Sequence, residues 1–311
     1  MRLTVHPVPG HGAEDVLVDP ADGSVLTGTE DGAVTRVAAD GRRTTRLGVT
    51  GGRPLGLEWL PDGRVLVCDS TRGLLALDAT SGAVEPLVTT VDGRPMRFCN
   101  NAAVADDGTI YFTDSSRRFG RERWKDEMVQ DTRTGRLLRR DPDGTVTTVL
   151  DGLAFANGVA LAADASWVCV AETAAARLRC LRLTGPRAGG ADVVDGLPGY
   201  PDNASRGTDG LVWVAIASPV DPVVGLVRRA PLALQRLTTR LPAPLQPAPR
   251  RTVRVRGYDV TPAGLDLVHD VDATAMATAD AAFHMVTGVR EHDGRLWLGS
   301  LHEPAVAVLD R

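Results

Sequence analysis

One unit recurs six times along the 311 residues of this chain. Each copy has a short apolar strand, a turn that begins with Asp and usually continues with Gly, and a second strand rich in Val, Leu, Trp or Tyr. The turn aspartates are Asp22, Asp62, Asp107, Asp164, Asp209 and Asp293. Asp-Gly between two apolar runs is a strong hairpin signal, because glycine tolerates the positive φ that tight turns require. The repeat therefore predicts an all-β chain.

The spacing of the turns predicts how the units assemble. Successive turn aspartates are 40, 45, 57, 45 and 84 residues apart, and the spacings near 40 to 45 suit a four-stranded blade with its loops. A closed ring of blades leaves only short, protected sheet edges. We therefore predict a single six-bladed β-propeller over residues 1–311, with Leu3 to Val8 supplying a strand that closes the ring in the last blade.

The longer spacings require insertions at residues 117–133 and 219–260. In the second insertion, apolar residues follow a nearly helical spacing and precede a Pro-rich run over 241–249. The apolar residues are Val224, Val227, Leu234 and Leu237. We predict a short helix and a stiff connector there. The helix would either cover one end of the central channel or pack on the edge of a blade.

Composition limits the kinds of molecule that this chain is expected to bind. A formal net charge of −4 with interspersed signs gives no footprint for nucleic acid or an anionic membrane, so we expect a small-molecule partner. The N-terminus lacks the apolar core of a signal peptide, and no long apolar run occurs, which predicts a cytoplasmic protein. Cys68, Cys99, Cys169 and Cys180 lack C-x-x-C spacing, and we expect buried thiols. The oligomeric state does not follow from the sequence.

Polar residues recur at one phase of the repeat. The first strand of each blade lies nearest the propeller axis, so equivalent residues of these strands converge on the central channel. Seven residues before the turn aspartates stand Leu55, Asn100, Asn157, Asp202 and Val286. In the first unit the turn is one residue longer, and the equivalent residue is Glu14. Four of the six positions therefore carry a carboxylate or a carboxamide.

These four side chains predict a metal site. Buried polar groups without partners cost several kcal/mol each, and two converging carboxylates repel unless a cation or a proton intervenes. Two carboxylates and two amide oxygens suit a hard cation, and calcium more than magnesium, because calcium accepts about six to eight oxygens in irregular geometry. The alternative is a channel plug, in which Glu14, Asn100, Asn157 and Asp202 bond to one another and to water.

Several segments carry a family resemblance. The most telling are Arg97-Phe-Cys-Asn-Asn, Phe155-Ala-Asn-Gly-Val-Ala, Leu197-Pro-Gly-Tyr-Pro-Asp-Asn and Glu291-His-Asp-Gly-Arg-Leu-Trp-Leu-Gly. In this order and spacing the chain resembles the calcium-dependent six-bladed propellers: the senescence-marker-protein/gluconolactonase family, diisopropyl-fluorophosphatase, paraoxonases and strictosidine-synthase-like proteins. The resemblance implies that the same four residues bind catalytic calcium.

The resemblance also implies roles for neighbouring residues. Asn101 and Asn203, next to the ligands, would face the same pocket, and His302 aligns with a pocket histidine of the fluorophosphatase. Strictosidine synthases carry a catalytic glutamate in the segment before Glu291-His-Asp-Gly, and Thr287 takes its place here. This departure argues against strictosidine synthesis.

The resemblance favours calcium-dependent hydrolysis of a lactone or related ester, with the metal polarising the carbonyl in the propeller channel. Asp202 would activate water or attack directly, and His302 and His284 are the next candidates for moving a proton. Glu172 and Asp69 end second strands and would either line the pocket or close turns. Arg97 would bind an anionic substrate or lie in solvent.

Three alternatives stay open. One is a metal-dependent cyclase, isomerase or condensing enzyme of bacterial secondary metabolism, since chemistry belongs to sites and not to scaffolds. Another is a propeller that binds a ligand without turnover. The last is a protein-interaction propeller, which ranks lowest because aromatic residues make up only 4% of the chain.

Overall fold

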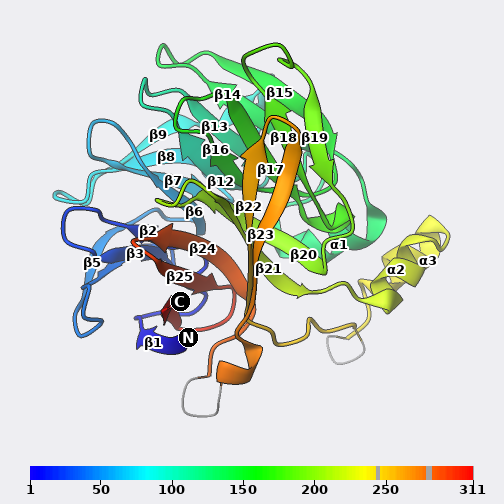
Figure 1. Cartoon of the computed structure of the whole chain (residues 1–311). Helices are drawn as coiled ribbons and strands as arrows, with labels where there is room; N and C mark the ends of the chain where they lie inside the picture. Colours follow the sequence, from blue (N-terminus) through cyan, green and yellow to red (C-terminus); the bar gives the residue numbers. More distant parts are fainter. Residues whose placement is uncertain (243–245, 278–281, 311) are drawn as a thin grey trace.

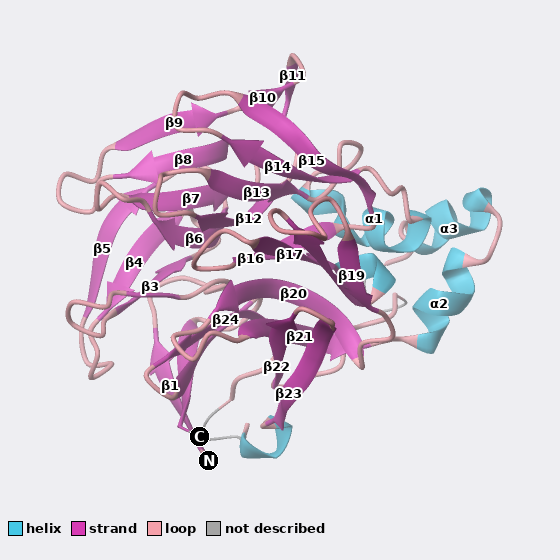
Figure 2. Cartoon of the chain, turned by 45° about the horizontal axis from the view of Figure 1, so that its top comes forward, coloured by secondary structure: helices cyan, strands magenta, loops and turns pink. Residues whose placement is uncertain are grey.

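The chain forms a ring of six four-stranded antiparallel sheets around a central axis (Figure 1 and Figure 2). The computed structural model describes residues 1–242, 246–277 and 282–310. The six-bladed β-propeller that the repeat predicts is confirmed.

Blades one to three follow the chain from inner to outer strand. Blade one contains β2 (Leu17–Val18), β3 (Val25–Gly28), β4 (Ala33–Val37) and β5 (Thr44–Val49). Blade two contains β6 (Pro54–Trp59), β7 (Val65–Asp69), β8 (Gly73–Leu77) and β9 (Val84–Val88). Blade three contains β12 (Cys99–Val104), β13 (Ile110–Asp114), β14 (Gly135–Arg140) and β15 (Val146–Leu153). A hairpin of β10 (Thr90–Val91) and β11 (Arg94–Pro95) lies between blades two and three in the sequence.

Blades four to six complete the ring. Blade four contains β16 (Ala156–Leu161), β17 (Trp167–Glu172), β18 (Arg177–Arg182) and β19 (Ala191–Val194). Blade five contains β20 (Gly199–Arg206), β21 (Val212–Pro219), β22 (Arg254–Thr261) and β23 (Gly264–Asp272). Blade six contains β24 (Val286–His292), β25 (Arg295–Ser300), β26 (Ala305–Asp310) and β1 (Arg2–Pro7).

Both ends of the chain build the last blade. β1 pairs antiparallel with β26, and Leu3 lies opposite Leu309. Figure 1 shows the N and C marks close together. This pairing confirms that the first alternating segment closes the ring. The predicted turns also hold, because each joins the first and second strands of its blade, and glycines such as Gly63 (φ 84°) adopt the expected left-handed backbone.

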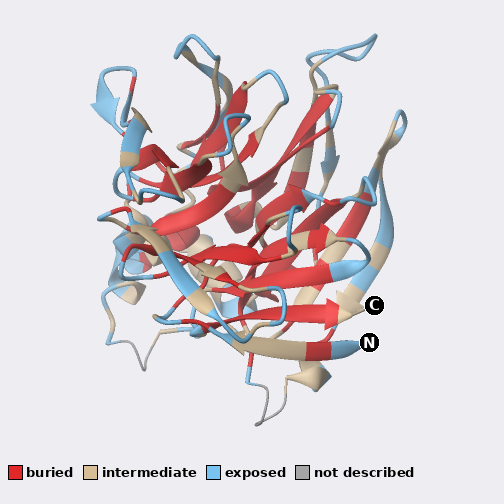
Figure 3. Ribbon diagram, turned by 90° about the vertical axis from the view of Figure 1, so that its left-hand side faces the viewer, coloured by how far each residue is buried: buried red, intermediate tan, exposed pale blue. Residues whose placement is uncertain are grey.

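Apolar side chains fill the spaces between neighbouring blades. Leu66 of blade two packs in one cluster with Phe112 of blade three, and Val170 of blade four packs with Leu137 of blade three. Buried residues concentrate in the inner strands, while the outer strands and turns are exposed (Figure 3). The rigid inner strands are therefore the part of the fold that can position a site.

Around the inside of the ring, one equivalent position of the first strands alternates between large and small residues. This position holds Asp15, Gly56, Asn101, Gly158, Asn203 and Gly288 in blade order. The glycines are needed because a Cβ on Gly56 would lie 2.7 Å from the Asn101 Cα, and a Cβ on Gly288 would lie 2.6 Å from the Glu14 carbonyl oxygen. Neighbouring inner strands can therefore approach to backbone contact.

The two insertions meet on one side of the ring (Figure 2). The first contains the short 3₁₀ turn Arg121–Arg123 and α1 (Trp124–Gln130). The second contains α2 (Pro222–Arg228) and α3 (Leu232–Thr238), so the prediction of one short helix there is corrected to two. Thr239 Oγ1 donates to Asp126 Oδ1 (2.8 Å) and Lys125 Nζ donates to Gln246 Oε1 (2.7 Å). These bonds join the two insertions into one structure.

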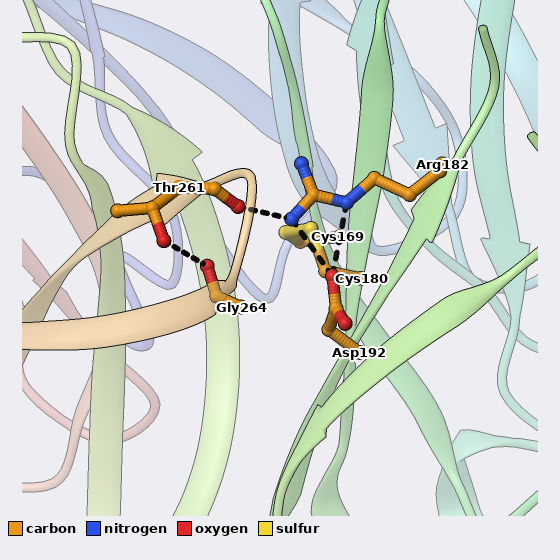
Figure 4. Close-up of a disulfide and its surroundings, with 6 residues drawn as sticks. All are labelled: Cys169, Cys180, Arg182, Asp192, Thr261 and Gly264. Carbon is orange, nitrogen blue, oxygen red and sulfur yellow. Dashed lines mark hydrogen bonds and ion pairs between the residues drawn. A yellow bond between two sulfur atoms is a disulfide. The ribbon is translucent and has the colours of Figure 1, made fainter. Parts of the chain in front are cut away.

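Within the described part of the chain, two further 3₁₀ turns of the same length lie at Thr173–Ala175 after β17 and at Thr274–Met276 after β23. In addition, the expectation of four buried thiols is wrong for one pair. Cys169 and Cys180 lie directly opposite each other on β17 and β18 and form a disulfide, beside the ion pair of Arg182 with Asp192 (Figure 4). Cys68 and Cys99 are free and buried, as expected.

Candidate metal centre

A β-bulge in the first strand of the blades aims side chains at the axis. In blade three, Cys99 pairs with Asp114 and Ala102 pairs with Phe112, so Asn100 and Asn101 together oppose a single residue. The same shift occurs in blades two, four, five and six. A bulge redirects the side chain of its first residue. Because this offset recurs from blade to blade, the residues at one phase of the repeat point toward the axis and together form a site.

The sixth position requires a correction. Counting seven residues back from Asp293 predicts Val286, but Val286 pairs with Ser300 and the first bulge residue is Thr287. The blade-six hairpin is tighter than the others, because His292 already pairs with Arg295. The ring therefore consists of the first bulge residues Leu55, Asn100, Asn157, Asp202 and Thr287, completed by Glu14 at the equivalent position of blade one, where strand pairing begins only at Leu17.

The four predicted ligands line one cavity of about 680 Å³. We call the end formed by Glu14, Asn100, Asn157 and Asp202 the floor, and the end formed by the two insertions the roof. Glu14, Asn100 and Asn157 are buried, with at most 6% of their surface exposed. The roof contributes Trp124 and Val224 among others. The insertions therefore cover one end of the channel, which is the first of the two arrangements predicted for the helix of the second insertion.

Hydroxyl groups orient the two floor amides. Asn100 Nδ2 donates to Ser115 Oγ (2.9 Å), and Asn157 Nδ2 donates to Thr173 Oγ1 (3.1 Å). Each bond fixes which end of the amide is the nitrogen and leaves Oδ1 free. Asn100 Oδ1, Asn157 Oδ1 and Asp202 Oδ1 are shielded from solvent and have no hydrogen-bond partner among the residues that the structure describes. Such groups are costly unless something satisfies them.

The charges of the floor are also unbalanced toward the negative. Burial, together with the negative charge of Glu14, raises the pKa of Asp202 well above its ordinary value. A divalent cation bound by the unpartnered oxygens would relieve both the desolvation and the repulsion. Within the described residues, no three His, Cys, Asp or Glu side chains form a metal cluster, so a cation here depends on the two amide oxygens. The donor set fits a hard cation.

One floor residue has a partner that the sequence did not reveal. Arg53 Nη2 donates to Glu14 Oε2 (2.7 Å) and Arg53 Nη1 donates to the Gly12 carbonyl oxygen (2.8 Å). Both charged side chains are buried. Thr287 Oγ1 donates to the Glu14 carbonyl oxygen (2.9 Å), so Thr287 holds the backbone of a ligand and does not line the cavity.

The two histidines occupy different places. His302 lines the cavity, whereas His284 stands behind it, with the two ring centroids 6.3 Å apart. His284 Nδ1 pairs with Glu303 Oε1, and burial lowers the pKa of His284 despite that carboxylate. His302 is therefore placed to meet a substrate directly, and His284 can act only through it.

The structure does not bring the other predicted substrate-binding residues to the cavity. Asn101 Oδ1 accepts a bond from Val159 N (2.8 Å), and buried Asn203 occupies the equivalent place in blade five. Glu172 accepts bonds from Arg177 Nε and Ala154 N, and Asp69 accepts one from Thr71 N. Both carboxylates close loops at strand ends, which matches the structural alternative.

Arg97 is exposed on the surface outside the cavity, which matches the solvent alternative. The sequence reasoning also missed the walls of the cavity. Phe98, Phe155, Tyr200 and Met285 line it just above the floor. Each precedes a first bulge residue by two positions, so the phase that revealed the ligands could have found these residues too.

Comparisons with known proteins agree with this architecture. The model of the SMP-30/Gluconolactonase/LRE-like region matches residues 14–244. The protein STRICTOSIDINE SYNTHASE-LIKE 10 of Arabidopsis thaliana is 35% identical over 272 residues, covering 83% of this chain and 70% of the relative. The adipocyte plasma membrane-associated protein of Rattus norvegicus is 33% identical, covering 95% of this chain and 80% of the relative. The chain belongs to the SMP-30/gluconolactonase/LRE-like family.

Solved structures share the fold at low identity. A gluconolactonase from Xanthomonas campestris superposes with a TM-score of 0.68 at 17% identity, covering 99% of this chain and 89% of the other. The calcium-binding protein regucalcin from Agrobacterium tumefaciens superposes with a TM-score of 0.64 at 16% identity, covering 97% of this chain and 90% of the other. Among the described residues, no helix is long and apolar enough to cross a membrane.

Proposed function

We propose that this chain is a calcium-dependent hydrolase of a lactone or related ester. The observation that carries the proposal is the floor, where three shielded oxygens without partners and the Glu14 carboxylate converge at the end of a cavity of substrate size. Solved structures that share the fold add support, since they include proteins named as a gluconolactonase and as a calcium-binding regucalcin.

The floor residues divide into holding and reacting groups. Glu14, Asn100, Asn157 and Asp202 would hold the calcium, which supplies polarisation of the substrate carbonyl when bound. Ser115 and Thr173 keep the amide oxygens directed at the site. Asp202 would take the proton from the attacking water, or its carboxylate would itself attack the carbonyl carbon, since this side chain lines the cavity at the floor.

His302 completes the arrangement from the cavity wall. Its ring can give a proton to the leaving oxygen, while His284 and Glu303 behind it fix its surroundings. The roof excludes water from the chemistry once a substrate fills the cavity. A small-molecule substrate and a cytoplasmic location remain parts of this proposal.

A second candidate is a non-hydrolytic metal-dependent enzyme, favoured by the relatives named strictosidine synthase-like. Thr287, at the position of the catalytic glutamate of strictosidine synthases, is engaged with the Glu14 backbone. A cyclase or isomerase would therefore have to use Asp202 or His302 instead.

A substrate screen with and without chelator separates these functions. Purified protein is assayed against lactones, aryl esters and organophosphates, then stripped with chelator and supplied with calcium again. Turnover that disappears with chelator and returns with calcium supports hydrolysis. A flat screen by a protein that retains one tightly bound calcium favours the non-hydrolytic candidate, and binding without turnover favours a ligand-binding propeller.

A further inference from the structure

Four blades place a large apolar side chain directly above the floor. Phe98, Phe155, Tyr200 and Met285 stand two residues before Asn100, Asn157, Asp202 and Thr287, respectively. All four line the cavity, and we call them the collar. The Phe98 and Phe155 ring centroids lie 5.4 Å apart at a tilt of 54°. The collar is therefore a repeated feature of the ring, like the floor itself.

Backbone strain at two of the collar residues indicates that their large side chains serve a function. Phe155 and Met285 adopt left-handed backbone, with φ of 61° and 56°. This conformation costs a non-glycine residue about 1–2 kcal/mol. The equivalent residue of blade one is Gly12, with φ of 66°, so glycine satisfies this backbone without strain. Blades four and six keep large apolar residues there despite the cost.

Polar groups near the roof are already engaged with the protein. Gln246 accepts a bond from Lys125 Nζ and donates to the carbonyl oxygens of Thr239 and Leu241. The Tyr200 hydroxyl accepts a bond from Asp221 N (3.2 Å) at the start of α2. Arg121 and Glu30, which also line the cavity, pair with each other (3.1 Å). The apolar part of the lining includes Met128, Val223, Val224 and Val227. A substrate rich in hydroxyls would therefore replace only some of its bonds to water, with groups such as His302 and Ser218.

We propose that the substrate carries an apolar alkyl or aryl group, which the collar and the roof bind while the ester carbonyl faces the floor. The preferred class is an apolar lactone or aryl ester, in contrast to a sugar lactone. This inference rests on the proposed hydrolysis for its kinetic test, but the collar is also testable by binding alone.

The experiment compares three lactones: γ-undecalactone, γ-butyrolactone and glucono-δ-lactone. With calcium-loaded protein, kcat/KM for γ-undecalactone should exceed each of the others by at least about tenfold, because each buried methylene adds binding free energy. Phe155→Gly removes the ring and relieves the backbone strain, and should lower this preference by about tenfold. The control is Ala165→Gly, which relieves similar strain (φ 53°) in the turn between β16 and β17, outside the cavity lining, and should leave the preference unchanged.

The outcomes keep the two proposals apart. If the sugar lactone or γ-butyrolactone is hydrolysed as efficiently as γ-undecalactone, hydrolysis stands and the collar proposal fails. If no lactone is hydrolysed, calorimetric titration with γ-undecalactone decides. Binding that Phe155→Gly weakens and Ala165→Gly does not would support the collar although the hydrolase proposal had failed. Absence of binding would overturn the collar.

Discussion

Arg53 and Glu14 form a buried ion pair at the edge of the floor, with 2.7 Å between Arg53 Nη2 and Glu14 Oε2. The side chains expose only 5% and 7% of their surface. The guanidinium therefore neutralises part of the floor and holds the Glu14 carboxylate in place. We therefore expect this buried arginine, beside a proposed metal ligand, to couple the stability of the propeller to calcium binding.

Arg53→Gln tests that coupling. Breaking a buried pair leaves an uncompensated charge, so the variant should lose about 3 kcal/mol of unfolding free energy in chelator. Calcium should restore more stability to the variant than it adds to the wild type, because the cation replaces the lost positive charge. Urea unfolding with and without calcium measures both effects. Arg64→Gln, which breaks surface pairs with Asp62 and Glu85, should cost less than about 1 kcal/mol in either condition. Equal calcium stabilisation of Arg53→Gln and wild type would contradict the coupling.

Thr173 positions a ligand without being one. Its Oγ1 accepts the bond from Asn157 Nδ2 and donates to the Pro201 carbonyl oxygen (2.7 Å). Thr173→Val should free the amide to rotate and weaken calcium binding by about tenfold or more, as loss of an outer partner of a metal ligand commonly does. Thr173→Ser keeps the hydroxyl and should bind calcium nearly as the wild type does. Titrations of the two variants that coincide would remove the positioning role.

Gly56 tests the close approach of the inner strands. Gly56→Ala would bring a Cβ within 2.7 Å of the Asn101 Cα, and should cost about 1–3 kcal/mol of unfolding free energy. Gly225→Ala, in α2 with open space around its Cβ, should be neutral or stabilising. Thermal unfolding of the pair measures the difference. Equal thermal stability of the two variants would show that the inner strands do not need glycine at residue 56.

Asp270 predicts a pH dependence of stability. Bonds from Arg254 and Arg256 lower the pKa of Asp270 from 3.8 to about 2. A lowered pKa in the folded state stabilises above the unfolded value of 3.8, and this contribution is lost as the pH falls through about 2. Since the pair is partly exposed, solvent screening limits the contribution to about 1 kcal/mol.

The matching variant is Asp270→Asn. It should be less stable than wild type by about 1 kcal/mol near neutral pH, and the difference should vanish near pH 2. Asp266→Asn, on the exposed part of the same strand, serves as the control and should follow the wild-type curve. A constant difference between Asp270→Asn and wild type across this range would show that the pair does not act through charge.

The blades and most of the floor could be predicted because both are periodic. Turn chemistry and strand alternation are local, and the phase of Asn100, Asn157 and Asp202 follows from the turns. The same counting failed at Val286, since a tighter hairpin shifts the register by one residue. Counting along one strand pattern therefore works only where the hairpins have equal length.

Contacts between blades could not be predicted in this way. Arg53 reaches Glu14 across 39 residues of sequence, and Asn101 turns to the backbone of the next blade. The Cys169–Cys180 disulfide depends on the β17–β18 register, which sequence spacing alone does not fix. The first two contacts depend on how neighbouring blades pack, and the disulfide depends on strand register within blade four, so in each case the relevant information is spatial.

Calcium binding by the stripped protein tests the central claim most directly. Equilibrium dialysis of wild type, Asn157→Ala and Asp202→Asn is compared with Asp221→Asn, which makes the same change as Asp202→Asn but at the α2 end of the cavity. We expect wild type and Asp221→Asn to bind a single calcium ion per chain. Both floor variants should lose that ion while the propeller stays folded. Full calcium occupancy in both floor variants would contradict this expectation.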